Sequence, residues 1–190
     1  MHEKILFLDA EFTDMLNPEL LSMAMVTRDG REFYAELDLK SPTGKARHAA
    51  SSDFVKYGIF EFWGQVPGAS CTALEMGRRA AEWLLKIASN SKPPLTIAFD
   101  YSTDYELLEY VIRDAGLWDR VREVVVPLNV NEVTGTITGE LAAEYCYEQL
   151  CKPGGRGLHR HHALADALAL RAAYVALNPR VQVVGAGRTR

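Results

Sequence analysis

A chain of 190 residues is typical of one globular domain with a full hydrophobic core. Its formal net charge of -4 argues against a tight grip on a long duplex, so any contact with nucleic acid should be short or should rely on metal ions that offset the phosphates. No apolar stretch reaches the length of a membrane helix, the N-terminus lacks a signal-peptide pattern and the three cysteines form no framework spacing. We therefore expect a cytoplasmic protein with no membrane association.

The first predicted strand, residues 5–8, is an unbroken apolar run that leads into Asp9-Ala10-Glu11. Such a run predicts a strand that is buried on both faces of an α/β sheet. Side chains alternate along a strand, so Asp9 and Glu11 should point to the same side. Adjacent carboxylates repel unless a proton or a cation lies between them, and their oxygens suit Mg²⁺ or Mn²⁺. Asp-x-Glu is a common pattern, so taken alone the motif favours a strand that ends in a solvated acidic loop, and the rest of the chain must decide.

Two further strands should follow as a meander. Residues 20–27 form a second apolar run, and Asp29-Gly30 predicts a hairpin turn. Residues 32–38 alternate, which predicts a strand near the sheet edge with a solvated face. That face would carry Glu32, Tyr34, Glu36 and Asp38. Residues 40–48 should be a polar loop.

Residues 51–63 are crowded with aromatic side chains. They could form a platform for stacking bases or a dimer surface, but we favour a short helix packed on the core. Thr72 and Glu75 then form a capping box, which predicts a helix to about residue 89. On that helix we expect Arg78 and Arg79 to lie on a solvated face.

The remaining chain should alternate strands with helices. Strands are expected at 95–99 and 121–126, a turn-rich loop at 131–138, and helices at 103–116, 140–151 and 163–177. A meander followed by this alternation predicts an α/β fold with a mixed five-stranded sheet flanked by helices. The domain should span residues 1–180 and be followed by a C-terminal tail, residues 181–190.

Acidic residues recur at three places in this arrangement. Asp9 and Glu11 follow the first strand, Asp100 and Asp104 follow the fourth, and Asp166 begins the last helix. In open α/β sheets functional groups gather beyond the carboxyl ends of strands, so these acids should meet. Each acid near a helix start is also explained by the helix dipole alone.

Three segments together resemble the motifs of the DEDDh family of 3′–5′ exonucleases, in the ribonuclease H-like superfamily. They are LDAEFTDMLNPELL, IAFDYSTDYELL and HHALADALAL. Relatives include oligoribonuclease, ribonuclease T and the proofreading subunit of DNA polymerase III, and the likeness covers residues 4–177. The small size and the run DFVKYGIFEFW are most similar to small bacterial stand-alone exoribonucleases.

The resemblance implies a ribonuclease H-like fold and a site for two divalent ions, Mg²⁺ or Mn²⁺. Asp9 would bridge the ions, Glu11 and Asp166 would complete one site, and Asp104 would hold the other. His161, five residues before Asp166, would be the general base, near an unperturbed pKa of about 6.5. Asp100 stands where the family has an asparagine-containing lead-in, so Asp100 and Asp104 both remain candidates for the second motif.

The resemblance also implies a substrate: single-stranded nucleic acid, with short RNA favoured, degraded from the 3′ end to 5′-mononucleotides. Groups at Ala10, Phe12 and Thr13 would hold the terminal nucleotide, and Met15 or Leu16 would wedge against its base. Relatives are often homodimers. The alternatives are a DNA exonuclease, a catalytically silent binding relative, and a zinc site.

The zinc alternative rests on a different set of side chains, and would use Cys146, Cys151, His159 and His162.

The general base must be chosen among three neighbouring histidines, His159, His161 and His162. Chemistry alone does not choose among them, and the family spacing selects His161.

Overall fold

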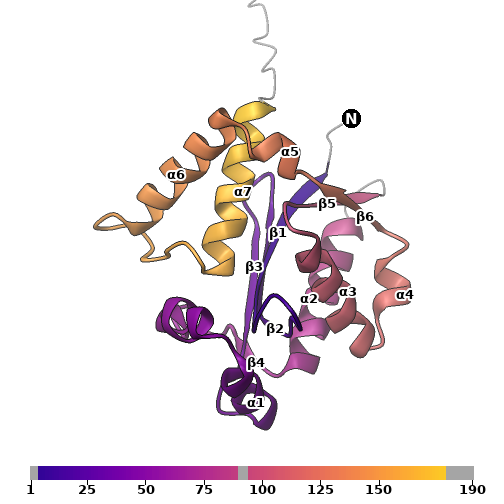
Figure 1. Ribbon diagram of the computed structural model, residues 1–190. Helices are drawn as coiled ribbons and strands as arrows, with labels where there is room; N and C mark the ends of the chain where they lie inside the picture. Colours follow the sequence, from indigo (N-terminus) through magenta and orange to yellow (C-terminus); the bar gives the residue numbers. More distant parts are fainter. Residues whose placement is uncertain (1–3, 90–93, 179–190) are drawn as a thin grey trace, which may run out of the picture.

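The computed structural model of the chain describes residues 4–89 and 94–178 and shows an α/β arrangement (Figure 1). Six strands form one mixed sheet in the order β4-β3-β2-β1-β5-β6. The strands are β1 (Ile5–Phe12), β2 (Leu20–Thr27), β3 (Glu32–Leu37), β4 (Ser70–Cys71), β5 (Leu95–Phe99) and β6 (Val125–Asn129). β1, β2 and β3 are antiparallel neighbours, whereas β1, β5 and β6 run parallel.

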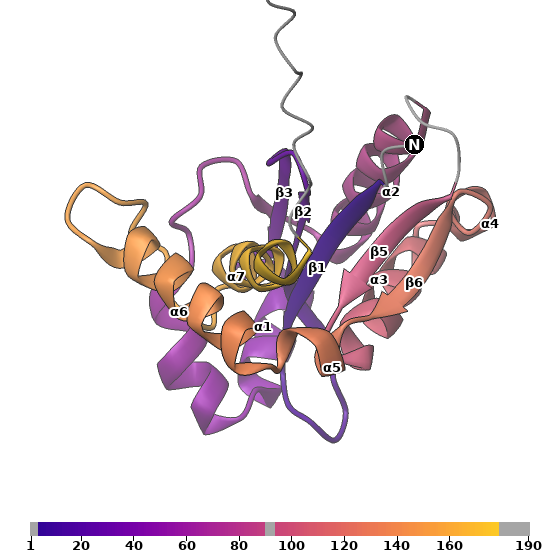
Figure 2. The ribbon, with the colours of Figure 1, turned by 90° about the horizontal axis from the view of Figure 1, so that it is seen from above.

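Helices cover both faces of the sheet (Figure 2). The helices are α1 (Pro42–Ala50), α2 (Ala73–Ser89), α3 (Ser102–Asp114), α4 (Trp118–Val121), α5 (Asn131–Thr134), α6 (Ile137–Cys151) and α7 (Ala163–Leu177). On one face α7 packs on β1 and β2, and α6 packs on α7. On the other face α2 and α3 pack against each other and against the sheet.

Strand alternation divides the core between these two faces. From β1, Leu6 and Leu8 pack into the larger core with side chains of α2 and α3, whereas Ile5 and Phe7 pack beneath α7. β1 is therefore buried on both faces, as its unbroken apolar run predicts. The first hairpin also forms as predicted, and Gly30 adopts the positive φ of 91° that its turn requires.

The expectation of five strands is wrong, because β4 adds a sixth strand parallel to β3. It has only two residues, too few to show a periodic pattern. The expected strand at 121–126 is displaced, since α4 includes Val121 and β6 begins at Val125. Both Trp118 and Val121 are buried, so helical packing prevails over the β-propensity of the valines.

Residues 40–48 form much of a helix and not the expected loop. Ser41 caps α1 by accepting a hydrogen bond from the Gly44 N–H at 3.0 Å, and Pro42 occupies the first turn. Serine followed by proline is a helix start signal, which the polar composition obscured. The predicted loop at 131–138 likewise contains α5 and the first residues of α6.

We expected the outer face of β3 to be solvated, but Glu36 on that face is buried and only 1% exposed. Its carboxylate accepts hydrogen bonds from the Tyr34 hydroxyl at 2.9 Å and from the Gly64 N–H at 3.1 Å. The Trp63 indole N–H also donates to the Leu37 carbonyl at 3.0 Å. The chain after the aromatic segment thus folds over this edge of the sheet.

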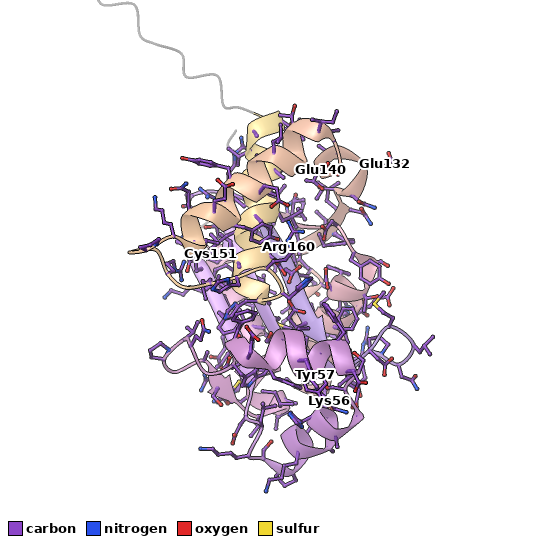
Figure 3. The ribbon with its side chains drawn as sticks, turned by 60° about the vertical axis from the view of Figure 1, so that its left-hand side comes forward. Lys56, Tyr57, Glu132, Glu140, Cys151 and Arg160 are labelled. Atoms are coloured by element: carbon purple, nitrogen blue, oxygen red, sulfur yellow. The ribbon has the colours of Figure 1, made fainter. Side chains whose placement is uncertain are left out.

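The aromatic segment forms a π-helical turn, Val55–Ile59, and a 3₁₀ turn, Phe60–Phe62. Val55 and Ile59 enter the core, so the preferred packing interpretation is confirmed for this side of the segment. Tyr57 is 78% exposed (Figure 3). Phe54 is 58% exposed, although its ring makes a T-shaped contact with the His161 ring, with centroids 5.0 Å apart.

The predicted tail, residues 181–190, lies outside the described residues. Across the described ranges, no helix combines the length and the apolarity that crossing a membrane requires.

Candidate metal centre

β1 supplies the first two acids of the site. Asp9 and Glu11 continue the row of Ile5 and Phe7 that faces α7. Glu11 is 9% exposed, and its antiparallel partner on β2 is the buried Ser22. The two carboxylates therefore lie under a helix, on the same side of a central strand, as the Asp-x-Glu spacing predicts.

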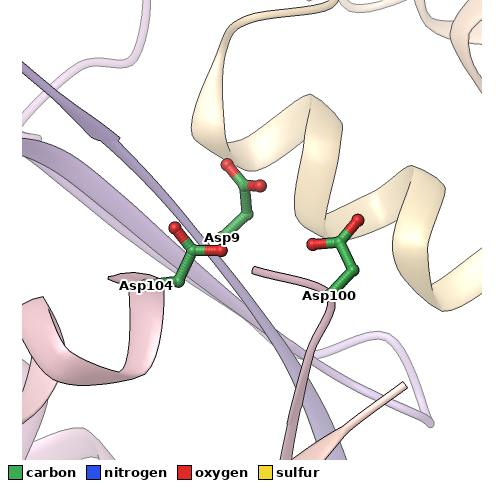
Figure 4. Close-up of side chains that lie close together, drawn as sticks. All are labelled: Asp9, Asp100 and Asp104. Atoms are coloured by element: carbon green, nitrogen blue, oxygen red, sulfur yellow. The ribbon is translucent and has the colours of Figure 1, made fainter. Parts of the chain in front are cut away.

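The register of the parallel strands brings Asp100 to Asp9. β1 pairs Phe7 with Ala98 of β5, and Asp100 directly follows the end of β5, where it joins Asp9 in one acidic group. Asp104 follows in the first turn of α3 and is only 2% exposed. Figure 4 shows these three carboxylates gathered from β1, from the end of β5 and from the start of α3.

Asp166 lies in the first turn of α7, the helix that covers Asp9 and Glu11. Small buried alanines on α7 let this helix approach the sheet closely, and Ala24 of β2 packs in the same cluster. Two donors hold the carboxylate: the Tyr147 hydroxyl donates to Oδ1 at 2.6 Å, and the His161 N–H donates to Oδ2 at 3.0 Å. The side chain is therefore fixed before any ion arrives.

The acids form two groups that share Asp9. One contains Asp9, Glu11 and Asp166, and the other contains Asp9, Asp100 and Asp104. Within each group, one carboxylate oxygen from every residue lies within 4.8 Å of the others. All these donors are carboxylate oxygens, which suit a hard divalent cation such as Mg²⁺ or Mn²⁺. The cluster could thus hold metal at two adjacent positions.

Burial and mutual repulsion raise the pKa of these carboxyl groups. Burial raises the pKa of Asp9 and of Glu11 well above their ordinary values, and the neighbouring Asp166 and Asp104 add to both shifts. Burial, then the charge of Asp100, raises the pKa of Asp104 to about 8. Burial raises the pKa of Asp166 to about 6, although Tyr147 and His161 stabilise its charged form. A bound cation would reverse this preference for protons.

The structure separates the three neighbouring histidines. His161 lines a cleft of about 330 Å³ together with Asp9 and Asp166, and its backbone has a φ of 66°, in the left-handed region. His162 is only 3% exposed and accepts a hydrogen bond from the Leu164 N–H at 3.2 Å, as the N-cap of α7.

His159 stacks on Phe62, and its Nδ1 lies 3.3 Å from the Cys151 thiol sulfur. Neither this pair nor His162 belongs to a metal-ligand group among the described residues. The zinc set of Cys146, Cys151, His159 and His162 is therefore not assembled in this part of the chain.

The residues expected to bind a nucleotide lie after the acids. Ala10 is buried, and Phe12 is half-buried and stacks on Tyr101 with ring centroids 6.3 Å apart. The Thr13 N–H donates to the Glu19 carbonyl at 3.1 Å, so that group is already engaged within the loop.

The expected wedge residues lie in the turn that follows. Met15 and Leu16 are 66% and 95% exposed. The Asp14 carboxylate accepts hydrogen bonds from the Leu16 N–H at 2.7 Å and the Asn17 N–H at 2.8 Å, which stiffens the turn that carries them.

Sequence reasoning missed two contributors to the site, Tyr147 and Arg160. Tyr147 comes from α6 and carries no local signal, because only the packing of α6 on α7 brings its hydroxyl to Asp166. Arg160 lies in the basic, glycine-rich loop before α7 and lines the cleft. Its position directly before His161 was the available signal.

No protein-family model and no curated protein matches the chain.

Asp9→Asn should raise the melting temperature of the metal-free protein near neutral pH. The substitution removes the charge that both groups of acids share. Relief of about 1–2 kcal/mol of electrostatic repulsion corresponds to a rise in melting temperature of roughly 2–8 °C for a domain of this size. In the wild type, the pKa values of Asp9 and Asp104 are raised, so these groups stay protonated in the folded state at pH values where the unfolded chain has lost the same protons, that is, above about pH 4. Stability should therefore fall as the pH rises from about 4 to 8.

Thermal melts across this pH range, with and without Mg²⁺, measure both effects. Mg²⁺ should restore the stability of the wild type and leave the Asn variant nearly unchanged. A wild type that is equally stable at every pH, and indifferent to Mg²⁺, would contradict the assignment.

Asp104→Asn should weaken Mn²⁺ binding at least tenfold, and Asp100→Asn should weaken it less. The reason is exposure: Asp104 is buried, so water cannot replace it, whereas Asp100 is exposed and a water ligand can substitute. Calorimetric titration with Mn²⁺ gives both affinities. The reverse order would make Asp100 the principal ligand of the second position.

Proposed function

We propose that the chain is a metal-dependent 3′–5′ exonuclease of the DEDDh type, with a ribonuclease H-like fold. The observation that carries the proposal is that two clusters, each of three acidic residues, share Asp9. Two-metal nucleases hold ions roughly 3.5–4 Å apart on bridging carboxylates, and groups that share one acid suit that arrangement. The antiparallel order β3-β2-β1 followed by the parallel β5 and β6 supports the fold assignment.

The reaction is hydrolysis of the last phosphodiester bond of a single strand. The ions, when bound, would activate the attacking water and stabilise the leaving oxygen. Asp9 would contact both ions, Glu11 and Asp166 one of them, and Asp104, with Asp100 beside it, the other. The attacking water gives a proton to His161 as its oxygen bonds to phosphorus. The bond from phosphorus to the 3′ oxygen breaks, and that oxygen takes a proton from solvent to become a hydroxyl. A 5′-mononucleotide then leaves a chain that is one nucleotide shorter.

His161 is the general base of this proposal. It lines the cleft with Asp9 and Asp166, as proton transfer from a water at the ions requires. Partial burial, and then the charge of Arg160, lower the pKa of the imidazole from its ordinary value. The neutral, proton-accepting form therefore persists to a lower pH than in a free histidine.

Short single-stranded RNA is the proposed substrate. The acidic chain argues against a long duplex, and the motifs favour a stand-alone exoribonuclease. Exposed Met15, Leu16, Phe54 and Tyr57 supply apolar and aromatic surface on which unpaired bases can stack.

Digestion of 5′-labelled RNA and DNA oligomers of several lengths, with Mg²⁺ or Mn²⁺, tests the proposed function. We expect a ladder that shortens from the 3′ end, 5′-mononucleotides as product, faster loss of short RNA than of DNA, and full inhibition by EDTA. Faster loss of DNA would make the chain a DNA exonuclease. Binding without cleavage would make it a silent relative, and cleavage that survives EDTA would refute the two-metal chemistry.

His161→Ala should reduce turnover by roughly 10²–10⁴-fold, the usual contribution of a general base. Mn²⁺ affinity should be nearly unchanged, and the acidic limb of the pH–rate profile should flatten. In the wild type that limb should have its midpoint below the ordinary histidine pKa, because the pKa of His161 is lowered.

His159→Ala and His162→Asn are the matched controls, and asparagine preserves the capping of α7. Both should retain most of the turnover. An inactive His162 variant beside an active His161 variant would overturn the assignment of the base.

A further inference from the structure

The cleft next to the metal centre has an unusual balance of charge. It extends between α5, α6 and α7, and its lining includes four acids, Asp9, Asp100, Glu140 and Asp166. Arg160 is the only lysine or arginine among the described residues that line it. In the view of Figure 3, Arg160 lies between α6, which carries Glu140, and the aromatic segment that carries Tyr57. A phosphate that enters here meets this single guanidinium amid negative charge.

Arg160 is tied to the metal centre through its backbone. The peptide bond that follows it carries the His161 N–H, which donates to Asp166 Oδ2 at 3.0 Å. The φ of 66° at His161 turns the chain sharply at this point. The start of the Arg160 side chain is therefore fixed close to a metal ligand.

The guanidinium of Arg160 is also linked to Asp166 through the side chain of Tyr147. It lies 4.7 Å from the centroid of the Tyr147 ring, a cation–π arrangement. The hydroxyl of that ring donates to Asp166 Oδ1 at 2.6 Å. One tyrosine thus orients both the metal ligand and the arginine.

The ion pair of Arg160 with Glu144 leaves the guanidinium available. Its side chain is 52% exposed and that of Glu144 57% exposed, and pairs at such exposure contribute little to stability. A guanidinium has five N–H donors in a fork that matches phosphate oxygens. A phosphate can therefore replace Glu144, or share the fork with it.

We propose that Arg160 binds the phosphate of the nucleotide at the metal centre, the group that becomes the 5′-phosphate of the released product, and that Tyr147 is its positioning residue. The inference rests on the proposed function. It assigns the recognition of substrate phosphate to a side chain outside the acidic residues and the histidine, and it predicts weaker binding, not slower chemistry, when the guanidinium is lost.

The test compares the binding of AMP and adenosine, with Mg²⁺ present, in the wild type and in Arg160→Ala and Arg160→Lys. Loss of a charge-assisted hydrogen bond should weaken AMP binding roughly 10- to 100-fold in the Ala variant, and less in the Lys variant. Adenosine, which lacks the phosphate, should bind equally to all three. Mg²⁺ affinity should not change, and the KM for a short RNA should rise with kcat nearly unaffected.

Arg156→Ala is the matched control. It removes the same charge from the same loop, but Arg156 pairs with Glu32, with 2.8 Å between guanidinium nitrogen and carboxylate oxygen, and does not line the cleft. It should bind AMP as the wild type does. Glu144→Gln should bind AMP at least as tightly, because it removes the competing carboxylate.

Equal AMP affinity in the wild type and Arg160→Ala overturns the inference, as does a wild type that does not prefer AMP to adenosine. Equal loss of affinity for AMP and adenosine assigns Arg160 a purely structural role and also overturns it. RNA hydrolysis by a wild type that fails these binding tests leaves the proposed function standing. Phosphate binding through Arg160 without RNA hydrolysis refutes the proposed function instead.

Discussion

The parallel pairing of β1 with β5 is the constraint on which the site depends. It brings Asp9 and Asp100 into one acidic group, and the first turn of α3 then brings Asp104 to the same point. α7 lies on the opposite side of these acids because its alanines pack closely on β1 and β2. The sheet therefore holds together carboxylates that would separate if they were free to move. Burial, and then the repulsion among the acids, raises the pKa values of Asp9, Glu11 and Asp104.

Hydrogen bonds fix part of the surroundings of the acids. Asp166 is held by two donors, and the loop before α7 is anchored at its end by the His162 cap. Carboxylates fixed in this way can bind a cation without first being reorganised, which favours metal binding over proton binding. The metal-free protein, in contrast, keeps a destabilised cluster in its interior. On the proposed function, the stability that Asp9 is expected to cost is the consequence of a site prepared for metal.

Much of this architecture follows from the sequence, because its signals are local. The apolar run of β1, the Asp-x-Glu spacing and the helix at residues 163–177 depend on periodicity within a single element. Features that depend on tertiary contacts were not predictable: the two-residue β4, the burial of Glu36 beneath the chain near Gly64, and the helical state of Val121. Tyr147 belongs to the same class, since its role arises only where α6 meets α7. Asp100 is intermediate, because its place follows from a strand register that a sequence suggests but does not determine.

In the proposed site, Asp9 is shared by two adjacent cation positions. Anomalous diffraction from crystals of the protein grown with Mn²⁺ tests this arrangement most directly. We expect two manganese peaks roughly 3.5–4 Å apart, one among Asp9, Glu11 and Asp166 and the other among Asp9, Asp100 and Asp104, with Asp9 contacting both. Manganese absent from the acids at saturating concentration, or bound at a position that Asp9 does not contact, would contradict it.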